Sequence, residues 1–383
     1  MDCLVIADVF PSRLEPWRAP YNRRQIECLG ALADVTVVHP LPWTRLPGRP
    51  ALCGLTTGAD DLLEGIPTYH PLMRHLPVLG RRWLWRWALH AVQRALKRHG
   101  TRYDVVLATF AYPHGRAARD VARRLGVPYV VKVRGTDLHS LPPDGCRRKR
   151  TAEALRDADA VVAVSPNLAS AARDLGAAPA AVHLLLNGVD ADAFPVVPRE
   201  EARRQLGLEG AAPLLLYVGH LAEVKGPDVL IESLDGAEGV RLALAGQGPM
   251  RGSLRRRVSR AGLNGSVRLL GQISHRQVAL WMNAADALVL PSRREGCPNV
   301  VLEALCCGTP VVASRVGAVP ELLAEDCGVI VPPDDPPALS QAIRRVLRAS
   351  YDREAIRARV ADMSWQANAR RLHGILSAVS GEG

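Results

Sequence analysis

The alternation of short apolar runs with helical segments constrains the fold of this 383-residue chain more than any other feature. The runs hold three to six residues and fall into two series, and each run predicts a buried strand. The first series lies at 4–7, 35–39, 105–109, 129–133, 160–164 and 182–186, and the second at 214–218, 240–245, 267–270, 287–290, 310–313 and 329–331. Strands that alternate with helices build parallel sheets, so the sequence predicts an α/β protein.

A turn-rich stretch at 187–198 separates the two series. We therefore expect a doubly wound architecture of two Rossmann-like domains, at 1–190 and 198–363, with a cleft between them and a hinge in the turn-rich stretch. A last helix, at about 364–380, is expected to pack back on the first domain. Hydrophobic residues make up 48% of the chain and aromatic residues 4%, which suits an aliphatic α/β core. Ligands of such sheets bind at the carboxyl ends of the strands.

The charge and the cysteine content limit which binding partners and which cellular location are expected. The formal net charge of +11 lies mostly in the first half of the chain, which predicts contact with anionic partners. The eight cysteines form no Cys-x-x-Cys pair, a pattern that favours reduced structural thiols over a metal site. No apolar run reaches the length of a membrane span, and the N-terminus lacks the pattern of a signal peptide. A cytoplasmic location is therefore expected.

Two glycine-containing loops follow the first two strands of the second series. Gly219, His220 and Lys225 lie after the strand at 214–218, and Gly246 and Gly248 follow the strand at 240–245. A glycine at the end of a strand allows a ligand to approach the backbone, and a lysine on the same loop can neutralise a phosphate. A surface loop with a solvated lysine and a tight strand-to-helix turn are the alternative interpretations.

The segment at 291–304 carries the strongest functional signal. It runs from the end of a predicted strand through a loop into a predicted helix that Pro298 is expected to start. The free amides of Asn299 and Val300 at this helix start would form an anion site suited to a diphosphate.

Two carboxylates flank the predicted anion site. Glu295, beside Gly296 on the loop, can hold the hydroxyls of a sugar, and Glu303 in the second helical turn can accept two hydroxyl protons, as a ribose offers. The alternative is that Glu303 is a solvated helix residue and that Glu295 complements the helix dipole.

These motifs resemble those of the family-four retaining glycosyltransferases. The segment at 295–303 is similar to the Glu-x7-Glu motif of that family, within Glu-Gly-x-Pro-Asn-Val-Val-Leu-Glu-Ala. The stretches at 187–190, 219–226, 246–249, 308–313 and 317–321 also resemble the family, in the same order. The resemblance implies the GT-B fold, in which the second domain binds the nucleotide sugar and the first binds the acceptor.

Residue roles follow from the same resemblance. It implies that Lys225 contacts the donor diphosphate, Glu303 the ribose and Glu295 the transferred sugar. His220 stands where the family often has an arginine, and a neutral histidine would supply less charge to the phosphates.

Two loops of the first domain are expected to line the cleft. His114, in the loop after the strand at 105–109, resembles the active-site histidine of the family by position, although a structural histidine at a helix start is the alternative. Arg134 and Asp137 belong to a turn that resembles the Gly-Ser-Asp turn of the family, and they are expected on the acceptor side.

The segment at 81–99 predicts an amphipathic helix. On a helical projection, Trp85 lies on one face with Leu89, Val92 and Leu96, whereas Trp83 and Trp87 lie among arginine, histidine and lysine residues. A face of basic and aromatic side chains suits an anionic membrane surface, and a plain surface helix is the alternative.

Together these observations predict a retaining, hexosyltransferase-type glycosyltransferase of cell-envelope polysaccharide biosynthesis. It would move a sugar from a UDP- or GDP-sugar to a lipid-linked or glycan acceptor, as a cytoplasmic enzyme peripheral to the inner face of the membrane. No metal or other cofactor is expected, because Lys225 and the helix start can stabilise the leaving diphosphate. The alternatives are a nucleotide-sugar epimerase of the same fold and a non-catalytic basic module that binds a membrane or nucleic acid. Nucleic acid is not an expected partner, because the carboxylates at 295 and 303 repel a polyanion.

Overall fold

The computed structural model describes the chain except residues 13–14, 16–18, 43–60, 64, 74–82, 101, 144, 209, 211, 235–238 and 382–383, and the side chains of 61–63. The chain forms two compact units, the first of Met1–Leu186 with Trp365–Gly383 and the second of Asn187–Ser364. The division therefore falls a few residues before the expected boundary at residue 190. Residues 187–190 belong to the second unit because the Val189 amide donates to the carbonyl of Met363, which lies in that unit, at 2.8 Å.

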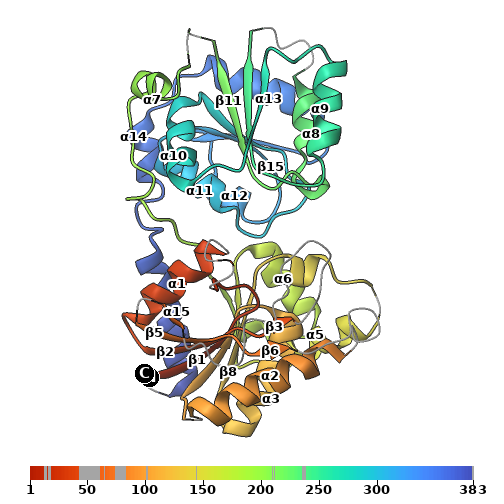
Figure 1. The fold of residues 1–383 in the computed structure, drawn as a ribbon, viewed down its shortest axis with the longest axis vertical. Coiled ribbons are helices and arrows are strands. Elements are labelled where there is room, and N and C mark those ends of the chain that lie inside the picture. The colour runs from red at the N-terminus through yellow and green to blue at the C-terminus, as the bar shows by residue number, and fades with distance from the viewer. Residues whose placement is uncertain are drawn as a thin grey trace. The chain divides into compact units, whose positions relative to one another are not determined.

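The first unit is built on an eight-stranded sheet (Figure 1). Its strand order is β10-β9-β8-β7-β1-β2-β5-β4, and every pair is parallel except β4 with β5. The strands are β1 (Asp2–Ile6), β2 (Asp34–Val38), β4 (Asp61–Leu63), β5 (Ile66–Tyr69), β7 (Val105–Ala108), β8 (Tyr129–Val133), β9 (Ala160–Ala163) and β10 (Val182–Leu184). A separate parallel pair joins β3 (Leu41–Pro42) to β6 (Leu72–Met73).

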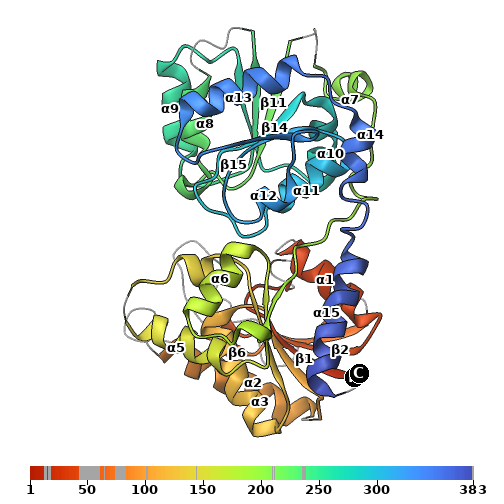
Figure 2. The ribbon, with the colours of Figure 1, turned by 180° about the vertical axis from the view of Figure 1, so that it is seen from behind.

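Helices cover both faces of this sheet. They are α1 (Pro20–Gly30), α2 (Leu84–His99), η3 (Ala111–Gly115), α3 (Arg116–Leu125), α4 (Thr136–His139), α5 (Cys146–Arg156), α6 (Pro166–Asp174), η4 (Pro179–Ala181) and α15 (Trp365–Ser380). Although α15 ends the chain, it lies beside α1, as Figure 2 shows. Gln25 of α1 donates to Asn368 of α15 at 2.5 Å, and Leu372 and Leu376 enter the core of this unit.

The second unit holds a six-stranded, wholly parallel sheet in the order β13-β12-β11-β14-β15-β16. Its strands are β11 (Leu214–Val218), β12 (Arg241–Ala245), β13 (Val267–Gly271), β14 (Ala287–Leu290), β15 (Val311–Ser314) and β16 (Gly328–Val331). Its helices are α7 (Arg199–Gln205), η5 (Glu223–Lys225), α8 (Pro227–Ser233), α9 (Arg251–Arg260), α10 (His275–Ala284), α11 (Asn299–Cys306), α12 (Val319–Leu322), α13 (Pro336–Arg348) and α14 (Arg353–Ala358).

The α/β prediction is confirmed, and all twelve predicted strands are present with ends shifted by at most two residues. The sequence did not predict β3, β4, β5 and β6. β3 and β6 have two residues each, β4 contains only two apolar residues, and β5 holds Pro67, which disfavours a strand. The predicted helix at 81–99 begins its α-helical part at Leu84, and residues 81–82 lie outside the described part of the chain.

The two faces of α2 are divided as the projection predicts. Trp85, Leu89, Val92 and Leu96 are buried, whereas Trp83 and Trp87 are 40% and 37% exposed. Within the described ranges, no helix combines the length and the apolar character needed to cross a bilayer.

Candidate active site

The loops after β11, β12 and β14 contact one another through backbone atoms at the carboxyl edge of the second sheet. Gly226 has a φ of 63°, and a Cβ there would lie 2.0 Å from the Pro291 carbonyl oxygen. Gly246 has a φ of 144°, and its Cβ would lie 1.9 Å from the Gly219 oxygen. Only glycine fits these contacts. These two glycines are therefore explained by loop packing, and the approach of a ligand to them stays a prediction.

Further backbone contacts fix the first two loops. The Gly219 amide donates to the Ala245 carbonyl at 3.0 Å, and the Leu221 amide donates to the Gln247 carbonyl at 2.8 Å. A Cβ on Gly248 would lie 2.3 Å from the Leu221 oxygen, so this glycine also marks a close backbone approach.

Lys225 and Glu295 come together although 70 positions separate them in the chain. The Lys225 ammonium donates to both carboxylate oxygens of Glu295, at 2.7 and 2.8 Å, and the Ser292 hydroxyl donates to the first of them at 2.7 Å. The Glu295 side chain is 7% exposed and the Lys225 side chain 30%. The site therefore holds a cation with access to solvent beside a carboxylate that is largely withdrawn from it.

The helix that follows begins one residue later than predicted. Pro298 has an extended ψ of 106° and caps the helix, so Asn299 is the first residue of α11. The first backbone amides of a helix, here those of Asn299 and Val300, have no carbonyl in a preceding helical turn to accept their hydrogen bonds. Such free amides are the general basis of anion binding at a helix start. The Asn299 side chain accepts from Asn187 at 2.9 Å, and Asn187 also donates to the Cys297 carbonyl at 3.2 Å. Asn187 thus holds the loop before α11 in place.

Glu303 is buried on α11, with 4% of its surface exposed. The alternative of a solvated helix residue is therefore wrong. It lies one helical turn beyond the helix start, and its contact with the ribose of a donor stays a prediction. The loop beside it is fixed by the Ala318 amide, which donates to the Gly296 carbonyl at 2.8 Å.

Arg293 is a residue of this region that the sequence did not single out. Its guanidinium makes two hydrogen bonds of 3.0 Å to Asp228 and an ion pair of 2.5 Å with Asp334. These contacts raise the pKa of Arg293, the hydrogen bonds to Asp228 most of all. Arg293 thereby ties the loop after β14 to the start of α8 and to the segment after β16. His220, by contrast, is exposed, and its carbonyl accepts from the Tyr217 hydroxyl at 3.0 Å and from the Ala222 amide at 2.8 Å.

In the first unit, Asp8 lies against His114. The Nδ1 atom of buried His114 is 2.8 Å from a carboxylate oxygen of Asp8, and no partner for its Nε2 exists among the described residues. Burial would raise the pKa of Asp8, but the hydrogen bond and charge of His114, with the charge of Arg134, hold it below its usual value. The one sequence signal for Asp8 is its place just after the first strand, at the carboxyl edge of the sheet.

His39 is buried and contacts both the backbone of Asp8 and a second buried histidine, His70. Its Nε2 is 3.2 Å from the Asp8 carbonyl oxygen, and its Nδ1 is 3.2 Å from Nδ1 of His70. Burial, together with the neighbouring His70, lowers the pKa of His39 to about 3, so this ring is neutral at physiological pH.

Asp137 and Arg134 differ in burial and in the groups that they contact. Asp137 is fully buried, and its carboxylate accepts from the backbone amides of Gly135 at 2.8 Å, Arg134 at 3.1 Å and Ala111 at 3.4 Å. It therefore fixes the turn after β8 against the start of η3, and burial raises its pKa. The Arg134 guanidinium is half-buried and donates to the Asn22 side chain. A contact of either residue with an acceptor stays a prediction.

Comparison with known proteins decides the family. The model of glycosyl transferases group 1 matches residues 198–363, and that of Glycosyltransferase Family 4 matches residues 13–193. A Bacillus subtilis protein, TuaC, provisionally named a teichuronic acid biosynthesis glycosyltransferase, is 31% identical over 93% of this chain and 90% of its own. The chain belongs to glycosyltransferase family 4. Another relative of this glycosyltransferase is D-inositol 3-phosphate glycosyltransferase 1 of Catenulispora acidiphila, 30% identical over 84% of this chain and 83% of its own.

Solved structures agree on the GT-B fold of the glycosyltransferase. Sucrose-phosphate synthase from Thermosynechococcus elongatus superposes with a TM-score of 0.78 at 23% identity, over the whole of both chains. Anabaena HepE, solved in complex with UDP, gives a TM-score of 0.76 at 19% identity over 99% of this chain and 100% of its own. In the described part of the glycosyltransferase, no group of three or more histidine, cysteine or acidic residues is arranged to hold a metal ion.

Proposed function

We propose that the glycosyltransferase transfers a hexose, with retention of configuration and without a metal ion, from a UDP- or GDP-sugar to a lipid-linked or cell-envelope glycan. The observation that carries this proposal is the pairing of Lys225 with Glu295. Glu295 lies in the loop that leads into α11, and α11 carries the buried Glu303. The names of two similar proteins support it. TuaC is provisionally named for teichuronic acid biosynthesis, and HepE was solved with UDP-glucose.

In the second unit, each group has a part in holding the donor. Departure of the nucleoside diphosphate places negative charge on its oxygens, and the Lys225 ammonium with the first amides of α11 would stabilise that charge. Lys225 would exchange part of its contact with Glu295 for the diphosphate, which frees carboxylate lone pairs for the hydroxyls of the transferred sugar. Glu303 would accept both hydroxyls of the ribose.

In the first unit, His114 would bind a hydroxyl of the transferred sugar through Nε2, the nitrogen with no partner among the described residues. Asp8 would act through His114 as a positioning residue, because its carboxylate favours the tautomer with the proton on Nδ1. The configuration would be retained because the acceptor hydroxyl attacks the anomeric carbon from the same face that the diphosphate leaves. The departing phosphate would take up the proton of that hydroxyl.

Replacing Asp8 with Asn is expected to lower kcat by about 100-fold, the lower end of the range for general acid–base groups, because Asp8 acts only through His114. The amide can present its NH2 group to Nδ1 and so favour the other tautomer. Steady-state kinetics would be measured with saturating donor, and 15N shifts of the His114 ring would report the tautomer. Unchanged kcat with a changed tautomer would contradict the role of His114.

The basic face of α2 would rest on the anionic inner leaflet of the membrane. Exposed Trp83 and Trp87 are suited to the interfacial region of a bilayer, and Arg86 lies 4.2 Å from the centre of the Trp83 ring. This contact would bring the glycosyltransferase to a lipid-linked acceptor from the cytoplasmic side.

The proposed function is tested first by donor binding. Thermal shifts would be compared for a panel of UDP- and GDP-sugars, and the stabilising donor would then be incubated with and without candidate glycan acceptors. Transfer of the sugar to an acceptor, with the anomeric configuration of the donor kept, is the expected result. A changed nucleotide sugar formed without any acceptor would instead identify an epimerase.

Turnover is expected to survive EDTA, because Lys225 and the helix start supply the positive charge that a metal would otherwise provide. The assay would compare initial rates before EDTA treatment, after it, and after adding back Mg²⁺ or Mn²⁺. A strict requirement for added Mn²⁺ would contradict the metal-independent mechanism.

A further inference from the structure

Arg293 connects the two loops that bring Lys225 and Glu295 together. It lies two residues before Glu295, in the loop after β14, and its backbone amide donates to the Val224 carbonyl at 2.9 Å. Its guanidinium donates to the carbonyl of Glu223. The backbone of the two residues that directly precede Lys225 is therefore bound by Arg293.

The chain that follows Lys225 is fixed to the same loop. Asp228, in the first turn of α8, accepts two hydrogen bonds of 3.0 Å from the Arg293 guanidinium. Two parallel bonds between a guanidinium and a carboxylate fix the orientation of both groups. Between these contacts, Gly226 packs against the carbonyl oxygen of Pro291, where a Cβ would lie 2.0 Å away.

The turn that carries Lys225 depends on such contacts for its position. Lys225 is the last residue of η5, a 3₁₀ turn of three residues. The Lys225 amide donates to the Ala222 carbonyl at 2.9 Å, and the Gly226 amide donates to the Glu223 carbonyl at 3.0 Å. A helix so short has too few hydrogen bonds of its own to hold a fixed place. Because Arg293 binds the chain on both sides of Lys225, it sets the direction in which the Lys225 side chain leaves the turn.

The Arg293 guanidinium is itself held at each of its three nitrogen atoms. Nη1 donates to the Glu223 carbonyl and to Asp228, Nη2 donates to Asp228, and Nε lies 2.5 Å from a carboxylate oxygen of Asp334. The side chains of Arg293 and Asp228 are 25% and 13% exposed. With every nitrogen engaged and two carboxylates beside it, Arg293 is suited to fixing loops and not to binding a phosphate itself.

We infer that Arg293 is a positioning residue of the transfer reaction, which holds Lys225 in place for the donor diphosphate before the donor binds. It acts through the backbone of η5 and through Asp228. The inference rests on the proposed function for the role of Lys225. A lysine that is already held needs less ordering when the ligand arrives, so less of the binding free energy is lost to fixing the loop.

Replacing Arg293 with Ala is expected to weaken binding of the nucleoside diphosphate about tenfold, because a long side chain and its loop must then be ordered on binding. In a protein that already carries Lys225→Ala, the same replacement should cause no further loss, because the group that Arg293 positions is absent. UDP and GDP would be titrated by calorimetry into the unmodified full chain, the two single variants and the double variant.

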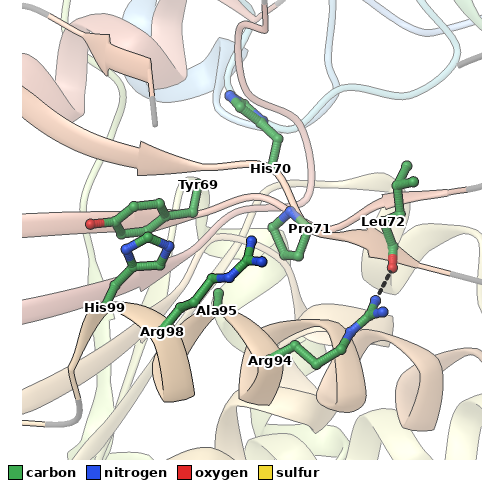
Figure 3. A pocket seen from close by; sticks show the side chains of 8 residues that line it. All are labelled: Tyr69, His70, Pro71, Leu72, Arg94, Ala95, Arg98 and His99. Atoms are coloured by element: carbon green, nitrogen blue, oxygen red, sulfur yellow. Dashed lines mark hydrogen bonds between the residues drawn. The ribbon is translucent and has the colours of Figure 1, made fainter. Parts of the chain in front are cut away.

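Two arginine variants serve as controls. Arg203→Ala removes a guanidinium at the amino edge of the second sheet, which donates to the Ala284 carbonyl at 3.0 Å and pairs with Asp286 at 2.7 Å. Its side chain is 16% exposed, so its burial is similar to that of Arg293. Arg94→Ala removes a guanidinium of the first unit that lines a pocket beside β5 and β6 and donates to the Leu72 carbonyl (Figure 3). Both controls should bind the nucleotides with unchanged affinity.

Hydrogen–deuterium exchange of the free protein gives a second measurement that needs no ligand. Without Arg293, the backbone amides at 221–228 are expected to exchange faster, because the turn opens more often. Arg203→Ala should leave exchange at these positions unchanged. If Arg293→Ala unfolds, Arg293→Lys takes its place, since it keeps the charge and loses the paired donors, and a smaller change in the same direction is expected.

A loss of affinity that disappears in the Lys225→Ala protein, together with faster exchange at 221–228, supports the inference. An equal loss with and without Lys225, an unchanged affinity, or the same loss in Arg203→Ala overturns it. Unchanged exchange at 221–228 overturns it in every case. If neither UDP nor GDP binds to the unmodified protein, that result counts against the proposed function, and the exchange measurement still decides whether Arg293 holds the turn.

Discussion

Replacing Lys225 with Ala is expected to lower kcat/KM by about two to three orders of magnitude, the loss seen when one preorganised group that stabilises a developing negative charge is removed. The variant loses the ammonium that contacts Glu295 and leaves that largely buried carboxylate without its cation. The leaving diphosphate would then depend on the amides at the start of α11 alone.

Three variants separate this role from a structural one. Lys225→Arg keeps a charge on a longer, planar group and should restore part of kcat/KM. Lys149→Ala removes an exposed lysine of the first unit and should leave kcat/KM unchanged. Glu295→Gln removes the other member of the pair, so its nucleoside diphosphate affinity should stay near that of the unmodified protein. If Lys225→Ala binds the nucleoside diphosphate with unchanged affinity and turns over normally, Lys225 serves only to satisfy Glu295.

Replacing Glu303 with Ala is expected to weaken binding of the nucleoside diphosphate by about 10²- to 10³-fold. Two hydroxyl hydrogen bonds to a carboxylate are lost, each worth about 1.5–3 kcal/mol, and part of that free energy is recovered by water in the space left behind. Glu303→Gln keeps one acceptor oxygen, so its affinity should lie between those of the Ala variant and the unmodified protein.

Calorimetric titration with UDP and GDP would measure this loss. Glu325→Ala is the matched control, because the Glu325 side chain is 93% exposed and contacts Arg345 only at 3.8 Å. The same titration with the 2′-deoxy nucleotide tests the contact directly, since the Ala variant should no longer distinguish the two nucleotides. A Glu303→Ala variant that keeps this distinction would contradict the ribose assignment.

The sequence determined the architecture because its signals are local. Each buried strand of a parallel sheet needs only a short apolar run, and twelve such runs with a turn-rich break predict two Rossmann-like units. The motif at 295–303 likewise lies within one loop and one helix, so its resemblance to family 4 could be established from neighbouring positions. The family matches then confirmed that resemblance.

Some positions escaped prediction because their partners are distant in sequence. Nothing near Asp8 indicates that it contacts His114, and nothing near Arg293 indicates that it joins Asp228 to Asp334. The glycines after β11 and β12 were expected to admit a ligand, yet the atoms closest to a Cβ at Gly246 and Gly248 belong to the neighbouring loop. Such contacts depend on how the loops of adjacent strands meet.

The sequence by itself therefore determined the order of the strands along the chain, their grouping into two series and the chemical types of the candidate site residues. Only the tertiary structure decided which of these residues meet, such as Lys225 with Glu295, and that the arginines of α2 form a pocket with β5 and β6. The physical reason is the range of the interactions. Hydrophobic periodicity is expressed within a few residues, whereas an ion pair or a pocket requires groups that the chain brings together only after its strands have paired.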